Sequence, residues 1–258
     1  MKLKNVILIM LTGLMFVCNI ASAKGVLSKN WRIESKSLGY ALQYRVYLPE
    51  GIANTDLLPT IYITDGQSYI SQDEGRMIEV LDREIEAGNI KPVVAVFIDS
   101  RNPDDLTENR RNEQFICNQD YAAFFITELV PTIDYNFPVS SNRNDRVIAG
   151  VSFGGLNAAC FGLLASKTFS GIGMHSPAND KHLKIISKLY KSVEAKPLKI
   201  FMSVGTKRDN TRAGRRFYRT LKEKNYDINY IEVPFGHVWE NWRPLMDDLL
   251  YTFFKKKG

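Results

Sequence analysis

Apolar runs and amphipathic stretches alternate along most of this chain. Six short apolar runs have the length of strands, at residues 59–65, 92–98, 146–151, 169–174, 198–204 and 228–233. Continuous apolar runs of this kind are typical of central parallel strands, which are buried on both faces. Helical spacing of apolar positions predicts helices at residues 73–87, 121–133, 156–164, 180–193, 210–225 and 240–256.

Polar and apolar residues alternate over residues 31–37 and 40–48, on either side of Gly39, which predicts a β-hairpin. From residue 59 onward, strands and helices alternate. This order predicts an α/β fold with a mostly parallel central sheet, helices on both faces and the hairpin as an antiparallel N-terminal edge. No repeat, low-complexity segment or linker interrupts the pattern.

The first 23 residues have the pattern of a secretory signal peptide. A start with two lysines precedes an apolar run over residues 6–17, and Ala-Ser-Ala ends at Ala23. We expect cleavage after Ala23, one domain over residues 24–258, a periplasmic or secreted protein, and no stable membrane insertion. An uncleaved anchor is the alternative. Lipid attachment at Cys18 is disfavoured, because a large Phe and Val precede it instead of small residues.

Composition narrows the possible partners. The 258 residues carry a net charge of +6, and loss of two signal-peptide lysines leaves about +4. This mild excess gives no indication of nucleic-acid binding. Beyond the signal peptide, Cys117 and Cys160 remain; an oxidising compartment permits a disulfide between them, but we interpret Cys160 as a small core residue. No Cys/His cluster has metal-ligand spacing, so we expect no metal and no cofactor.

A strand, a tight turn and a helix follow one another at residues 146–164. The turn reads Gly150-Val-Ser152-Phe-Gly154, between a buried strand and a helix of small apolar residues. This is the context of a nucleophile elbow, in which glycines on either side let strand and helix approach. We therefore predict Ser152 as a nucleophile. The alternative is a helix N-cap.

A serine hydroxyl needs a base, and the chain has three histidines. His237 follows the last strand, where a loop can bring it to Ser152, so we predict it as the base. His182 lies on a polar helix, and His175 could line a pocket. The alternative for His237 is a structural loop histidine.

The acid of a triad should lie between Ser152 and His237, after a strand. Asp209 follows residues 198–204 and is the predicted acid; Asp180 is the second candidate. The alternative for Asp209 is a helix N-cap. An oxyanion hole would use the backbone N–H of Phe153 and, after the strand at residues 59–65, that of Gln67.

Substrate contacts are expected from a long polar segment, residues 99–118, and from aromatic residues. The candidates are Arg101, Arg110, Arg111, Tyr69 and Trp239. The arginines could instead be solvated, and Arg110 or Arg111 could pair with Glu113. Trp242 is better explained by packing under the last helix.

Four segments together resemble the putative-esterase family of α/β-hydrolases. They are residues 149–156 around Ser152, 236–243 around His237, the Asp-Gly-Gln of residues 65–67, and residues 128–131. The likeness is greatest to enterochelin esterases, and the family also includes feruloyl and acetylxylan esterases, S-formylglutathione hydrolases and antigen 85 mycolyltransferases. The resemblance implies the α/β-hydrolase fold and carboxylic-ester chemistry through an acyl-enzyme. Some single-domain relatives work with a Ser–His pair, which leaves the role of Asp209 open.

Three functions follow from the resemblance. The first is hydrolysis of a siderophore ester, for which the arginines would bind an anionic catecholate. The second is a feruloyl or acetyl esterase acting on acylated polysaccharide. The third is a secreted acyltransferase or a binding protein that keeps the fold. The expected partner is a small-molecule or glycan ester, and the oligomeric state stays open.

Overall fold

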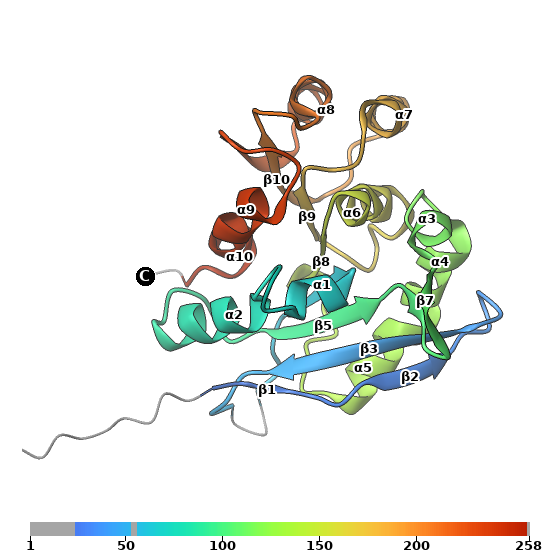
Figure 1. Ribbon diagram of the computed structural model, residues 1–258, viewed down its shortest axis with the longest axis vertical. Coiled ribbons are helices and arrows are strands. Elements are labelled where there is room, and N and C mark those ends of the chain that lie inside the picture. Colours follow the sequence, from blue (N-terminus) through green and yellow to red (C-terminus); the bar gives the residue numbers. More distant parts are fainter. Residues whose placement is uncertain (1–23, 53–55, 257–258) are drawn as a thin grey trace, which may run out of the picture.

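The structure is a computed structural model that describes residues 24–52 and 56–256; the expected signal peptide lies outside these residues. Within the described residues, nine strands form one mixed sheet (Figure 1). Its order is β1-β3-β5-β4-β8-β9-β10-β11, and β2 also pairs with β3. The strands are β1 (Val26–Leu27), β2 (Trp31–Glu34), β3 (Ala41–Leu48), β4 (Thr60–Thr64), β5 (Val94–Asp99), β8 (Arg146–Val151), β9 (Gly171–His175), β10 (Lys199–Gly205) and β11 (Asp227–Val233).

Strand direction confirms the predicted sheet. β3 is antiparallel to β1, β2 and β5. Every other strand pair, from β5 through β4, β8, β9 and β10 to β11, is parallel. The β2–β3 hairpin turns at Gly39, whose φ of 74° lies in the left-handed region that glycine adopts without strain. The fold is the α/β class with an antiparallel N-terminal edge.

The helices differ from the predicted ones mainly at their ends. They are α1 (Gly66–Ile70), α2 (Met77–Glu86), α3 (Arg111–Gln114), α4 (Gln119–Phe124), a π-helical turn η1 (Phe125–Leu129), α5 (Val130–Asn136), 3₁₀ turn η2 (Arg143–Asp145), α6 (Phe153–Leu164), α7 (Asp180–Ser192), α8 (Thr211–Glu223), α9 (Trp239–Trp242), 3₁₀ turn η3 (Arg243–Leu245) and α10 (Met246–Phe254). The single helix predicted over residues 240–256 is broken, because Pro244 cannot donate a backbone hydrogen bond. The short α1 was not predicted.

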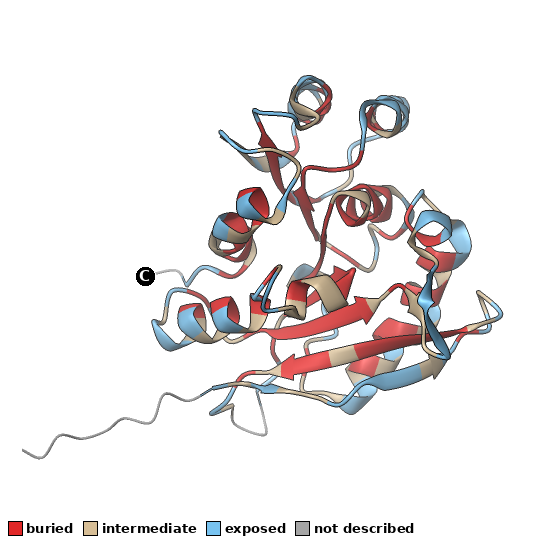
Figure 2. Ribbon diagram, viewed as in Figure 1, coloured by how far each residue is buried: buried red, intermediate tan, exposed pale blue. Residues whose placement is uncertain are grey.

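Two apolar clusters cover the two faces of the sheet. α4, α5, α6, α7 and α8 contribute to one cluster, and α2 and α10 contribute to the other. Figure 2 shows central strands that are mostly buried, an exposed edge strand β2, and helices with one buried and one exposed side. The central strands are apolar on both faces for this reason.

The segment at residues 99–118 has more regular structure than its sequence predicts. β6 (Arg101–Asn102) and β7 (Asp105–Asn109) form a small separate hairpin, and α3 follows it. The interpretation of Cys160 as an unpaired core residue was wrong: Cys160 is fully buried, but it is bonded to Cys117. The disulfide joins the end of this segment to α6, the helix behind Ser152.

None of the helices in residues 24–52 and 56–256 is both long enough and apolar enough to cross a bilayer.

Candidate active site

The sequence-predicted site residues follow four strands of the sheet. Gln67 comes after β4, Ser152 after β8, Asp209 after β10 and His237 after β11. These strands are parallel, so their carboxyl ends share one edge of the sheet, where ligands bind in open α/β folds.

Ser152 occupies a strained turn between β8 and α6. Its φ and ψ are 54° and −119°, a region that is costly for a residue with a side chain. A Cβ on Gly150 would lie 2.4 Å from the carbonyl carbon of Gly154, so the turn requires glycine there. Backbone bonds hold the turn: Ser152 N–H donates to His175 O at 2.9 Å, and Ser152 O accepts from Ala178 N–H at 2.9 Å.

Ser152, His237 and Asp209 form a hydrogen-bonded series. His237 Nε2 lies 2.9 Å from Ser152 Oγ, and His237 Nδ1 lies 2.8 Å from Asp209 Oδ1. The His237 side chain is 32% exposed, and the Asp209 side chain is completely buried. The imidazole therefore stands between a hydroxyl and a carboxylate at distances that allow proton transfer. The second candidate acid, Asp180, binds Arg216 instead.

Several donors keep Asp209 ionised. Burial raises its pKa, but hydrogen bonds from His237, from Ser176 Oγ at 2.5 Å, from Gly205 N–H at 2.6 Å and from Asn210 N–H at 2.7 Å outweigh this. The pKa of Asp209 is therefore below its ordinary value. An ionised carboxylate beside Nδ1 fixes the tautomer in which Nε2 accepts a proton.

The sequence did not predict the side chains that direct hydrogen-bond donors at Asp209 Oδ2. Ser176 is fully buried, has a φ of 41°, and accepts a hydrogen bond from Trp242 Nε1 at 2.8 Å while donating to Asp209. Asn241 also points its amide nitrogen at Asp209 Oδ2, at 3.4 Å. Nothing local in the sequence marks Ser176, because its role depends on contacts with residues far along the chain.

Two helix starts present backbone donors at the site. Phe153 opens α6 directly after Ser152, and Gln67 is the second residue of α1, whose N-cap Asp65 has a left-handed conformation. The first N–H groups of a helix have no acceptor within the helix. Phe153 thus directly follows Ser152, and Gln67 lines the same pocket as Ser152.

A pocket of about 250 Å³ opens at Ser152 and His237. The other residues that line it are Asp65, Gln67, Ser68, Glu74, Asn109, Arg111, Val151, Trp239 and Trp242. On the other side of Ser152, a hollow of about 310 Å³ is lined by Phe153, Ala178, Asn179, Arg208, Asp209 and Asn210 together with His237.

Arg111 lines the pocket and is paired with a buried carboxylate. Its guanidinium lies 2.6 Å from the buried carboxylate of Asp65 and 5.4 Å from the ring centroid of Phe153. Burial raises the pKa of Asp65, against the opposing effect of Arg111 and of a hydrogen bond from Ser100. The pair therefore positions both α1 and the 99–118 segment at the pocket wall.

The other two candidate arginines lie farther from Ser152. Arg101 binds Asp99 at 2.6 Å in a neighbouring hollow of about 300 Å³, which shares Gln67 with the main pocket. Arg110 binds Glu108 at 2.7 Å and lies over the ring of Tyr40 at 4.1 Å. The alternative pairing of Arg110 or Arg111 with Glu113 is not observed, because Arg110 pairs with Glu108 and Arg111 with Asp65.

Of the aromatic candidates, Trp239 lines the pocket, whereas Tyr69 is fully buried. The ring centroids of Tyr69 and Trp239 are 5.5 Å apart. Trp242 packs edge-on against His237 at 4.9 Å. His175 is buried under the sheet edge beside Ser203, and His182 packs on Phe153.

Across the described residues, no group of three or more His, Cys, Asp or Glu side chains is arranged to hold a metal ion. The pocket is lined by hydroxyl, imidazole, carboxylate, guanidinium, amide and indole side chains.

The serine lies in a nucleophile elbow on a mostly parallel sheet and is hydrogen-bonded to a histidine that follows the last strand. This combination defines an α/β-hydrolase. A model of the family described as "Putative esterase" matches residues 35–253. The chain belongs to this family of carboxylic ester hydrolases.

Individual relatives are more distant. The chain is 28% identical to the iron(III) enterobactin esterase of Yersinia enterocolitica over 156 residues, 60% of this chain and 42% of that protein. It is 24% identical to an endo-1,4-beta-xylanase/feruloyl esterase of Xylanibacter ruminicola over 232 residues, 86% of this chain and 30% of that protein. It thus spans less than half of either curated relative.

A solved structure shares the fold. The enterobactin esterase of Shigella flexneri, crystallised in the presence of enterobactin, superposes with a TM-score of 0.76 at 24% identity, covering 87% of this chain and 58% of that one.

Proposed function

We propose that this chain is an exported serine esterase that hydrolyses carboxylic esters through an acyl-enzyme on Ser152. The observation that carries the proposal is the unbroken series of hydrogen bonds from Ser152 Oγ through His237 to Asp209. Export rests on the sequence pattern of residues 1–23 alone.

In the first step, His237 Nε2 takes the proton of Ser152 Oγ while the oxygen attacks the ester carbonyl. The Phe153 and Gln67 N–H groups receive the developing oxyanion. Asp209 stabilises the imidazolium that forms. His237 then gives its proton to the departing alcohol, and the C–O bond breaks. Water, deprotonated by His237, attacks the acyl carbon and releases the acid and free Ser152.

For the substrate we propose an ester that carries a hydroxylated aromatic group. Trp239 and Trp242 form an aromatic wall beside Ser152 and His237, with their ring centroids 5.3 Å apart. An ester of a catechol siderophore is the first candidate, supported by the likeness to enterobactin esterases.

A feruloyl ester on polysaccharide is the second candidate, and one observation favours it. Arg111 is paired with Asp65, and Glu74 adds a further carboxylate to the pocket. A pocket with this charge balance suits a neutral aryl ester better than a strongly anionic iron–catecholate complex.

Two experiments test these proposals. Ser152→Ala and His237→Ala should each abolish p-nitrophenyl ester hydrolysis and labelling by a fluorophosphonate, with circular dichroism unchanged; residual activity near the wild-type level would refute the assignment. Asp209→Asn separates a triad from a Ser–His pair. A panel of catechol trilactone, feruloyl saccharide and acetyl saccharide then compares kcat/KM. A tenfold or greater preference for a saccharide ester would reject the siderophore ester.

A further inference from the structure

Two neighbouring helices carry the whole positive charge excess of this chain. α7 and α8 together contain nine Lys and Arg and two Asp and Glu, a net charge of +7. The complete chain has a net charge of +6, so all the other residues together have −1. Charge concentrated in this way creates a local potential that attracts anionic partners.

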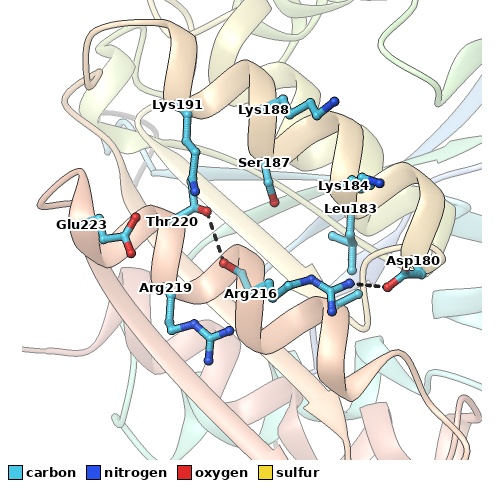
Figure 3. Close-up of a pocket in the computed structure, with 11 residues that line it drawn as sticks. Asp180, Leu183, Lys184, Ser187, Lys188, Lys191, Arg216, Arg219, Thr220 and Glu223 are labelled. Atoms are coloured by element: carbon cyan, nitrogen blue, oxygen red, sulfur yellow. Dashed lines mark hydrogen bonds and ion pairs between the residues drawn. The ribbon is translucent and has the colours of Figure 1, made fainter.

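A groove of about 590 Å³ runs between the two helices (Figure 3). Its charged side chains are Asp180, Lys184, Lys188, Lys191, Arg216, Arg219 and Glu223. In Figure 3, Arg216 extends from α8 to Asp180, and Lys191 points from α7 toward α8. Five cations against two acids leave the groove positive.

Most of these cations are not neutralised within the protein. In the part of the chain that the structure describes, ion pairs engage two of the nine basic residues: Arg216 with Asp180, and Arg215 with Glu232 at 2.6 Å. Seven cationic side chains on the exposed sides of α7 and α8 therefore keep their charge available for a partner.

Outside the groove, the exposed side of α7 also carries large aliphatic side chains. Ile185 and Leu189 lie one turn apart on α7 and are 50% and 41% exposed; Lys184 and Lys188 each precede one of them in the sequence. Side chains four residues apart share one face of a helix. A dissolved polyanion does not bury such side chains, whereas the interfacial layer of a bilayer does. The aliphatic stems of lysines can lie in the same layer while their charged ends reach the lipid headgroups.

We propose that the α7–α8 face docks on the surface of an anionic phospholipid membrane. Lysines and arginines would contact lipid phosphates, and Ile185 and Leu189 would enter the interface. Both helices begin at the edge of the sheet that carries Ser152. Among the described residues that line the pocket at Ser152, none comes from α7 or α8, so docking does not depend on the proposed catalytic groups.

Co-sedimentation of the purified chain with vesicles tests the proposal. We expect binding to vesicles of phosphatidylglycerol mixed with phosphatidylcholine, weakened by salt, and at least tenfold weaker binding to phosphatidylcholine alone. Each basic residue near an anionic leaflet strengthens partitioning by roughly fivefold. Lys184→Gln/Lys188→Gln/Arg219→Gln should therefore weaken binding by at least tenfold, while p-nitrophenyl ester hydrolysis is retained.

Two matched variants serve as controls. Lys36→Gln/Lys91→Gln/Lys255→Gln removes the same charge from exposed positions elsewhere and should leave most of the binding intact. Val26→Ser/Leu57→Ser is the corresponding control for Ile185→Ser/Leu189→Ser, which should weaken vesicle binding severalfold without any change in charge.

Three outcomes would overturn the proposal. One is equal binding to both kinds of vesicle, or no binding to either. Another is an equal loss in the matched charge controls. The third has two parts: Ile185→Ser/Leu189→Ser binds vesicles as tightly as the wild type does, and the wild type binds heparin as tightly as it binds anionic vesicles. This result would assign the face to soluble polyanions.

Discussion

Removal of the disulfide between Cys117 and Cys160 should cost this protein a large part of its stability. The two cysteines are 43 residues apart. In the chain-entropy treatment, closing a loop of this length lowers the conformational entropy of the unfolded chain, which raises its free energy by about 4 kcal/mol. Unfolding slopes in urea of about 2–3 kcal/mol per molar convert this value into a midpoint roughly 1.3–2 M lower.

The assay is urea unfolding of the chain from Lys24, followed by tryptophan fluorescence, with and without reductant. We expect the reductant to lower the midpoint of the wild type. Cys117→Ala/Cys160→Ala should unfold at the lower midpoint under both conditions, with a small further loss because Cys160 also fills space in the core.

Activity should respond as well. The disulfide anchors the end of the segment that carries Arg111 to the helix behind Ser152, so its loss should raise KM for aryl esters more than it lowers kcat. Two titratable thiols in the native protein under non-reducing conditions would refute the pairing. A change in midpoint equivalent to less than about 1 kcal/mol would refute the loop-closure reasoning.

Three further predictions concern buried groups near the site. Ser176→Ala removes a charge-assisted hydrogen bond to Asp209, so kcat/KM should fall about tenfold. The acid limb of the kcat/KM profile should also move to higher pH, because the carboxylate then holds the imidazolium more tightly. An unchanged pH profile would contradict this positioning role. Burial lowers the pKa of His175 to about 3 in the folded protein, so between about pH 6.5 and 3 the unfolded chain binds a proton that the folded chain does not, and stability is lost as pH falls. From pH 7 to pH 5 this group should remove about 2 kcal/mol from the free energy of unfolding, a loss that His175→Gln should lack in urea titrations. Gly150→Ala should destabilise the protein and reduce activity by at least a hundredfold, because its Cβ would collide with the backbone of Gly154; normal activity would show that the elbow tolerates a side chain.

Much of the fold could be predicted because it is encoded locally. The apolar run at β8, the two glycines around Ser152 and the amphipathic spacing of α8 each report on a few neighbouring residues. Since parallel strands bring their carboxyl ends to one edge, the positions of Asp209 and His237 relative to Ser152 also followed from the order of elements.

The remainder depends on contacts between distant segments, which spacing does not encode. Arg111 lines the pocket, as a substrate contact would, but its ion pair with Asp65, 46 residues away, could not be predicted. Ser176 meets Trp242 across 66 residues. Tyr69 was predicted to contact substrate from within the pocket. It is buried instead, because α1 packs on β5 and Tyr69 packs against Trp239. The β6–β7 hairpin is polar apart from Pro103 and Leu106, so it lacks the alternation that reveals a strand.

The backbone around the candidate site has a consequence for engineering. In the described chain, eight residues other than glycine have positive φ, and five of them, Asp65, Ser152, Ser176, Ala178 and Arg208, surround the pocket and hollow beside Ser152. Such conformations cost of order 1–3 kcal/mol each. Ser152→Gly should therefore give an inactive protein that is more stable than the wild type in urea. Selection of variants for thermal stability alone would drift toward glycine at these positions and lose the enzyme, so a stabilisation screen of this scaffold has to be coupled to turnover.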